Sequence, residues 1–345
     1  MLRLHKLASN DPEVMKCFDQ GDLAKGLTDL DLDCGVLPSQ RSLGIVWNLS
    51  SDDFVFKTDM SARPFTKRGI LYLNSVFDPL GFLAPVILEG RLILREIMRT
   101  KVDWDDIVPT EIALKWENWK ERLEDLEMFS IRRCYFERSL SEMSKVDLHI
   151  FSDASLTAIS AVVYVKGFLK GDNHVGFAVG KSKLAPEKGH TIPMLELCAA
   201  VLAVELYQSV ASHLCVDVYT VKFYTDSKVT LGYICNQPKR FFTYVSNRVH
   251  KIVSVSNPSQ WNFVPFEHNP IDIGSRGASL VKLLKSSLLS GPKFLQIDAN
   301  VSRPESFPLV NPTQDEEIRK EISGMASNVK DLNFSMGLFE SFPPG

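Results

Sequence analysis

The 345-residue chain has few of the features that mark secreted, membrane-spanning or zinc-binding proteins. Its six cysteines are scattered and no two form a C-x-x-C pair, which argues against a zinc ribbon or a disulfide scaffold and for reduced thiols. No run approaches 18 apolar residues, and the opening "MLRLHKLASN" has neither a long apolar core nor a small-residue cleavage site. We therefore expect no signal peptide, no membrane span and an intracellular location.

A strong excess of charge of one sign is also missing, because the formal net charge is only -3. Any signal for nucleic-acid binding must then be local. The composition is that of an ordinary globular protein, with 45% apolar and 23% charged residues, which is enough for a sizeable core. The length exceeds that of one average domain, so two domains are the natural expectation.

We place a domain boundary near residue 140, where the pattern of apolar residues changes. The first domain, residues 1–140, is predicted to be mostly helical. Its predicted elements are a hairpin over 42–59, two helical pieces over 68–99 that are broken near 78–85, a helix capped by Thr110, and a short strand over 131–136.

The second domain, residues 141–290, is predicted to be an α/β (α+β) unit with the order βββαβαβα. Three strands follow one another closely, which indicates an antiparallel meander, and helices then alternate with two further strands. The remaining residues, 291–345, are rich in proline and polar side chains and are predicted to be a flexible linker or tail.

Four acidic residues of the second domain stand at the ends of predicted elements. Asp153 ends the first strand, Glu196 lies in the first turn of the long helix, Asp226 follows the strand "VKFY", and Asp272 starts the last helix. Neighbouring strands would place Asp153 and Asp226 side by side, and packed helices could bring the other two to the same edge. Like charges that close need cations to stay ionised, and hard oxygen ligands select Mg²⁺ or Mn²⁺. Two such ions about 3.5–4 Å apart are the usual device for displacement at a phosphodiester.

Each of these acids also has a local explanation. Asp226 would cap a helix that starts at Ser227, Asp272 would cap one that starts at residue 273, and Glu196 would favour the helix dipole. The order and context of all four together favour the metal site.

The motifs around these acids resemble a known family. "HIFSDAS", "TIPMLELCAA", "FYTDSKV" and "NPIDIGSRG" are similar, in order, to the four motifs of the ribonuclease H domain of LTR retroelements, and most of all to the BEL/Pao group. "RPFTKRGILYLNSVFDPLGFLAPV" and "KVTLGYICNQPKRFFTYVSNRV" resemble the same group, so the resemblance covers roughly residues 1–295. It implies a ribonuclease H-like five-stranded mixed sheet with flanking helices, and a two-metal-ion endonuclease that cuts the RNA strand of an RNA–DNA hybrid. It assigns metal binding and catalysis to Asp153, Glu196, Asp226 and Asp272.

The upstream part resembles the distal palm, thumb and connection of a reverse transcriptase. The polymerase aspartates of that family have no counterpart in the chain, so we expect no DNA synthesis by it alone. The resemblance implies a fragment of a Pol polyprotein, with the rest of that polyprotein or a reverse transcriptase subunit as partners. It also implies a cytoplasmic location in a virus-like particle, and it is compatible with a presence in the nucleus.

Basic residues concentrate between 222 and 251, where Asp226 is the one acid. They could contact phosphates of the substrate, although a solvated helix face is the other explanation. A histidine shortly before Asp272 could assist product release, as a loop histidine does in some relatives. The candidate substrate-binding residues are Lys228, Lys239, Arg240, Arg248 and His268.

Besides the nuclease, two other functions come into question, and we reject the mechanism of the second. One is a catalytically silent remnant that binds nucleic acid without turnover. The other is an aspartic peptidase, because stretches like this are sometimes classed as Pao retrotransposon peptidases. Such peptidases need Asp-Thr/Ser-Gly loops, whereas "SDAS" and "YTDSK" have no glycine after the serine. Divalent-metal dependence separates the nuclease from the peptidase.

Overall fold

The computed structural model describes the greater part of the chain. The described residues are 6–24, 39–42, 45–56, 64–73, 76, 78–169, 171–187, 189–214, 216–236, 241–297 and 307–308. Most of the predicted tail therefore lies outside the described residues.

A five-stranded mixed sheet occupies the centre of the fold, with the strand order β7-β6-β5-β8-β9. The meander consists of β5 (Lys145–Ala154), β6 (Ala158–Leu169) and β7 (Asp172–Leu184), which pair antiparallel. Next to β5 lie β8 (Thr220–Thr225) and then β9 (Trp261–Phe263), both in parallel pairing. The predicted five-stranded mixed sheet is confirmed. Because β5 and β8 are parallel neighbours, with Ser152 opposite Thr225, their carboxyl ends meet at one edge of the sheet.

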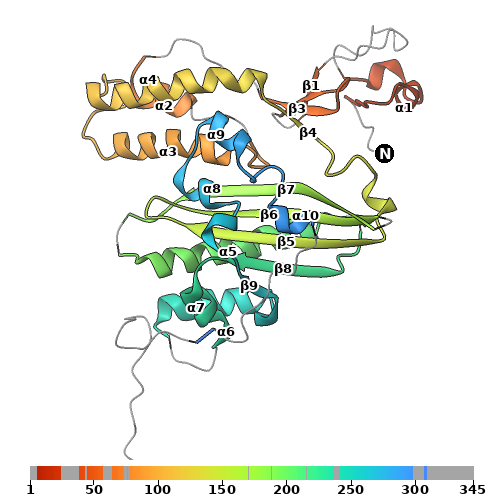
Figure 1. Ribbon diagram of the computed structural model, residues 1–345. Helices are drawn as coiled ribbons and strands as arrows, with labels where there is room; N and C mark the ends of the chain where they lie inside the picture. Colours follow the sequence, from red (N-terminus) through yellow and green to blue (C-terminus); the bar gives the residue numbers. More distant parts are fainter. Residues whose placement is uncertain are drawn as a thin grey trace, which may run out of the picture.

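Helices cover both faces of this sheet (Figure 1). One face packs against α5 (Ile192–Ala211), α6 (Lys228–Cys235) and α7 (Thr243–Val253). The other face packs against the upstream helix α3 (Ala84–Met98), and α4 (Thr110–Glu124) packs in turn on α3. The same face also carries three short helices: α8 (Asp272–Arg276) contacts both α3 and the sheet, α9 (Leu280–Lys285) contacts α3, and α10 (Lys293–Gln296) contacts β7.

The long helix α5 is apolar on most of its surface and is a core helix. Its length and composition alone would also suit a membrane span, but half of it is buried inside the protein, where it packs on β5 and β6. Its buried residues are Leu195, Glu196, Leu197, Ala199, Ala200, Leu202, Ala203, Val204 and Leu206. A single carboxylate, that of Glu196, is thus placed among apolar side chains under the sheet.

A smaller, four-stranded antiparallel sheet lies upstream, in the order β1-β2-β3-β4. Its strands are β1 (Ser39–Ser42), β2 (Ile45–Asn48), β3 (Asp53–Val55) and β4 (Ser130–Arg132), and the helices α1 (Pro12–Lys16) and α2 (Lys67–Leu73) belong to the same part of the chain. The predicted hairpin is formed by β2 and β3. The predicted cap at Thr110 is wrong, because Pro109 occupies the N-cap position and Thr110 is the first helical residue.

The loop before α3 contacts the edge strand β7 and so packs the upstream residues against the sheet. The Asp78 carboxylate accepts hydrogen bonds from the backbone N–H groups of Gly81, Phe82 and Leu83, at 2.7 to 3.0 Å. The Gly180 N–H of β7 donates to the Leu80 carbonyl (2.8 Å). One hydrophobic core thus extends across position 140, although the domain boundary predicted there stays a prediction.

Candidate metal and active site

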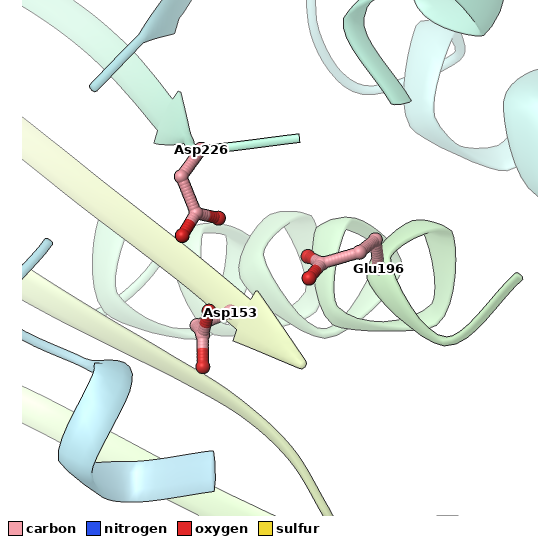
Figure 2. Close-up of side chains that lie close together, drawn as sticks. All are labelled: Asp153, Glu196 and Asp226. Carbon is pink, nitrogen blue, oxygen red and sulfur yellow. The ribbon is translucent and has the colours of Figure 1, made fainter. Parts of the chain in front are cut away.

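Three of the four predicted acids meet at the carboxyl edge of the sheet. Asp153 lies near the end of β5, Asp226 comes directly after β8, and Glu196 projects from α5. Each offers a carboxylate oxygen, and these oxygens all lie within 4.8 Å of one another. Figure 2 shows the three side chains extending from their separate elements toward a common space. The parallel pairing of β5 and β8 produces this arrangement, since it ends both strands at the same level.

Neither Asp226 nor Glu196 has the local role in a helix that the sequence offered as an alternative. Ser227, not Asp226, is the N-cap of α6, and its side chain accepts from the Thr230 N–H (3.2 Å). The prediction that Glu196 lies in the first turn is wrong, because α5 begins at Ile192 and places Glu196 one turn further in. Capping and helix-dipole interactions therefore do not account for the two residues.

Hydrogen bonds hold the acids only in part. The Ser275 hydroxyl donates to the Asp153 carboxylate, and the Asn269 side-chain amide donates to Asp226 and to the Ser152 carbonyl (3.1 Å to the latter). Glu196 accepts from the backbone N–H of Ala154. One buried oxygen of Glu196 and one of Asp226 still have no partner among the described residues. Buried polar atoms without partners are costly, so these two oxygens are suited to an additional ligand.

The electrostatics of the three acids favour a bound cation. Burial raises the pKa of Asp153 to about 8, and the charges of Asp226 and Asp272 add to the effect. Burial, together with the charges of Asp153 and Asp226, raises the pKa of Glu196 to about 9. Burial also raises the pKa of Asp226. The acids therefore cannot all be ionised at neutral pH by themselves, and a hard divalent cation fits the set of oxygen donors.

The fourth predicted acid, Asp272, lies beside this group rather than in it. It is the first residue of α8, where it accepts from Arg276 Nε at 2.8 Å. Its charge raises the pKa of both Asp153 and Asp226, so it acts on the same site. The alternative that it caps a helix starting at residue 273 does not hold, because Ile271 is the N-cap.

The structure describes three of the five predicted substrate-binding residues. Lys239 and Arg240 lie outside the described residues. The ammonium group of Lys228 lies over the Phe263 ring, 4.9 Å from its centroid. His268 is exposed at the end of the short helix η6 (Phe266–His268). For all four positions, substrate binding stays a prediction.

Arg248 is engaged within the protein. Its guanidinium carbon lies 3.4 Å from the centroid of the Tyr244 ring, and its Nε donates to Cys198 Sγ of α5 at 3.2 Å. The residue thus contributes to packing between α5 and α7, a role that neither sequence-based explanation included, and substrate binding by Arg248 stays a prediction.

Sequence reasoning missed the two residues that position the acids. Ser275 follows Asp272 by three residues and Asn269 precedes it by three, so both stand inside the quoted motif "NPIDIGSRG". Their partners are more than 40 positions away, and only the packing of α8 on the sheet brings them together. The motif contained the residues, but no local pattern indicated their roles.

Residues 66–227 match the profile of a family described as Pao retrotransposon-like RNaseH-like domain. This match confirms the resemblance to Pao retrotransposons over these residues. No curated protein matches the chain.

Several solved structures are similar to the chain. A foamy viral protease-reverse transcriptase dRH in complex with double-stranded DNA is 14% identical, with 66% of this chain and 37% of that chain covered and a TM-score of 0.40. LC11-RNase H1 in complex with an RNA/DNA hybrid is 19% identical, with 42% and 96% covered and a TM-score of 0.26. RNase H1 from the halophilic archaeon Halobacterium salinarum NRC-1 is 11% identical, with 45% and 100% covered and a TM-score of 0.24. The chain thus spans little more than a third of the foamy viral chain.

Proposed function

We propose that this Pao retrotransposon-like RNaseH-like domain is a metal-dependent endonuclease that cleaves the RNA strand of RNA–DNA hybrids. The observation that carries the proposal is the group of three carboxylates, Asp153, Glu196 and Asp226, at the carboxyl edge of two parallel strands. The description of the matching family supports the choice of substrate. We propose Mg²⁺ or Mn²⁺ as the cofactor, with two ions per site.

The three carboxylates would hold the metal, and Asp272 at the rim would complete the set of four acids. Divalent ions there would supply Lewis-acid stabilisation of charge at the phosphodiester and a water of lowered pKa. The chain itself supports the ligands: Ser275 donates to the Asp153 carboxylate, and hydrogen bonding from the Ala154 N–H and from Asn269 favours the ionised forms of Glu196 and Asp226. Ligands held in this way need little rearrangement when they bind.

Cleavage of a labelled RNA–DNA hybrid with Mg²⁺ or Mn²⁺ tests the proposal. The wild type should cut the RNA strand, and Asp226→Asn should lose nearly all of this activity. Asp172→Asn makes the same change at an exposed position of β7 and should keep full activity. Double-stranded DNA should remain intact.

Each other outcome has a definite meaning. Tight binding of the hybrid without cleavage would identify a catalytically silent binding module. Hydrolysis of a peptide substrate in EDTA would identify an aspartic peptidase, which requires no metal. Equal cleavage by the wild type and Asp226→Asn would show that these carboxylates are not the catalytic ones.

A further inference from the structure

We infer that a groove between α3 and α4 binds the phosphate backbone of duplex nucleic acid and leads it to the three carboxylates. The inference rests on the proposed function for the identity of that duplex, an RNA–DNA hybrid. The groove lies on the sheet face opposite α5, α6 and α7, so it is distinct from the surface that carries Lys228 and Arg248.

The groove has a volume of about 620 Å³ and is open to solvent. Its charged lining contains more cations than acids. The cations are Arg95, Arg99, Lys115 and Arg122, and the acids are Glu89 and Glu96. This lining carries two more positive than negative charges, whereas the whole chain carries a net charge of -3. A local excess of cations in a concave surface attracts polyanions, because clefts concentrate the field of the charges that line them.

Two of the cations are available to a new partner. Lys115 pairs with Glu96 at 2.8 Å, and Arg122 pairs with Glu89 at 3.0 Å. All four side chains are at least one quarter exposed. Exposed ion pairs contribute only about 0–1 kcal/mol to stability, so a phosphate can take the place of either acid at little cost.

The other two cations are held in place by the chain that follows β7. One terminal nitrogen of Arg95 donates to the Ala185 carbonyl at 2.9 Å, and Arg99 pairs with Glu187 at 3.0 Å. A guanidinium group has five N–H donors, and these contacts use only some of them. Both arginines are therefore oriented in advance with donors left for phosphate oxygens, which lowers the entropy cost of binding.

One end of the groove adjoins the site of the three carboxylates. Thr157, in the turn between β5 and β6, lines the groove. Its hydroxyl bonds to that of Ser155 (2.9 Å), which in turn donates to the Ser275 carbonyl (2.7 Å). The Ser275 hydroxyl donates to Asp153. A strand lying in the groove would thus pass beside the turn whose hydrogen bonds lead to Asp153.

Binding of a fluorescently labelled RNA–DNA hybrid, measured by anisotropy with Ca²⁺ in place of Mg²⁺, tests the inference. The variant Lys115→Gln/Arg122→Gln should bind about 5- to 10-fold more weakly at 0.1 M salt, and the slope of log affinity against log salt should fall by about 1 to 2. The matched control is Arg68→Gln/Arg132→Gln. It also removes two exposed, ion-paired cations, but neither lines the groove, so its affinity should stay within about twofold of the wild type.

A second variant, Lys115→Arg/Arg122→Lys, retains both charges and should bind within about twofold of the wild type. If Lys115→Gln/Arg122→Gln and the control weaken binding equally, the inference is wrong. Binding that depends on the groove, without cleavage, would overturn the proposed nuclease activity and support the inference about the groove. Cleavage together with binding that does not depend on the groove would support the nuclease activity and overturn the inference.

Discussion

The Ser275 hydroxyl donates a hydrogen bond to the Asp153 carboxylate, although 122 positions separate the two residues in the chain. Ser275 is completely buried, and its hydroxyl oxygen also lies 3.0 Å from the Asp272 carbonyl, so the two acceptors share its single proton. One side chain of α8 thus fixes the orientation of the acid that ends β5. The short helix matters to the site through this contact as well as through its own acid.

Replacing Ser275 by alanine should weaken metal binding. The change frees the Asp153 carboxylate to rotate, and the loss of a partner that orients a ligand typically costs about 10- to 100-fold in metal affinity or activity. Calorimetric titration with Mn²⁺ measures the affinity without catalysis. Ser286→Ala is the control, because it removes a hydroxyl that donates to the Leu283 carbonyl instead. Equal Mn²⁺ affinities for both variants would contradict the role assigned to Ser275.

Divalent metal should stabilise the wild type but not Glu196→Gln. At pH 7 without metal the two should be nearly equally stable, because burial raises the pKa of Glu196 to about 9 and keeps it protonated. Metal at 100 times its Kd should raise the free energy of unfolding of the wild type by about 2.7 kcal/mol and leave that of Glu196→Gln unchanged. Thermal unfolding with and without Mg²⁺ measures this difference. The exposed Glu117→Gln should behave like the wild type, and equal stabilisation of Glu196→Gln would exclude Glu196 as a ligand.

The stability of the wild type relative to Asp78→Asn should fall as pH rises from 4 to 7. Burial raises the pKa of Asp78 from 3.8 to about 6, even though three backbone N–H groups donate to its carboxylate. As pH rises, Asp78 therefore loses its proton at a lower pH in the unfolded chain than in the folded protein. The free energy that protonated Asp78 contributes to stability is fully present below pH 4 and is lost as pH rises through 6. The expected loss is about 3 kcal/mol, from roughly 1.4 kcal/mol per pKa unit. Urea unfolding at several pH values measures the difference in unfolding free energy between the wild type and Asp78→Asn. A difference that does not vary with pH would contradict the prediction.

Replacing Gly81 by alanine should destabilise the fold by about 3 kcal/mol or more, because it combines backbone strain with overpacking. Its φ is +78°, and a Cβ there would lie 1.8 Å from the Gly180 carbonyl oxygen. Gly171→Ala is the matched control, since Gly171 has a φ of +92° but open space around its Cβ position. That variant should lose only about 1–2 kcal/mol from backbone strain. Urea unfolding measures both losses. If Gly81→Ala and Gly171→Ala lose similar amounts of stability, the loop that contains Gly81 does not pack closely on β7.

The sequence predicted the features that depend on local pattern or on the resemblance. The meander and the helix α5 follow from apolar periodicity and element order, and the mixed sheet follows from the resemblance. That Asp153 and Asp226 lie side by side depended on β5 and β8 being neighbours, which the structure shows them to be. Contacts between distant segments could not be predicted in this way. The packing of Arg248 on Tyr244 depends on how α7 meets α5, and the α3–α4 groove depends on how upstream helices meet the sheet. No short window of sequence contains that information.

The contacts between α3 and β7 also affect the order in which the protein can fold. Arg91 and Arg95 of α3 donate to the Ser182 and Ala185 carbonyls, which lie 91 and 90 positions later in the chain. At a synthesis rate of about 5–20 residues per second, the ribosome needs on the order of 5 to 20 seconds to make that stretch. During this time the apolar face of α3 has no sheet to cover. We therefore expect newly made chains to depend on chaperones until β7 emerges.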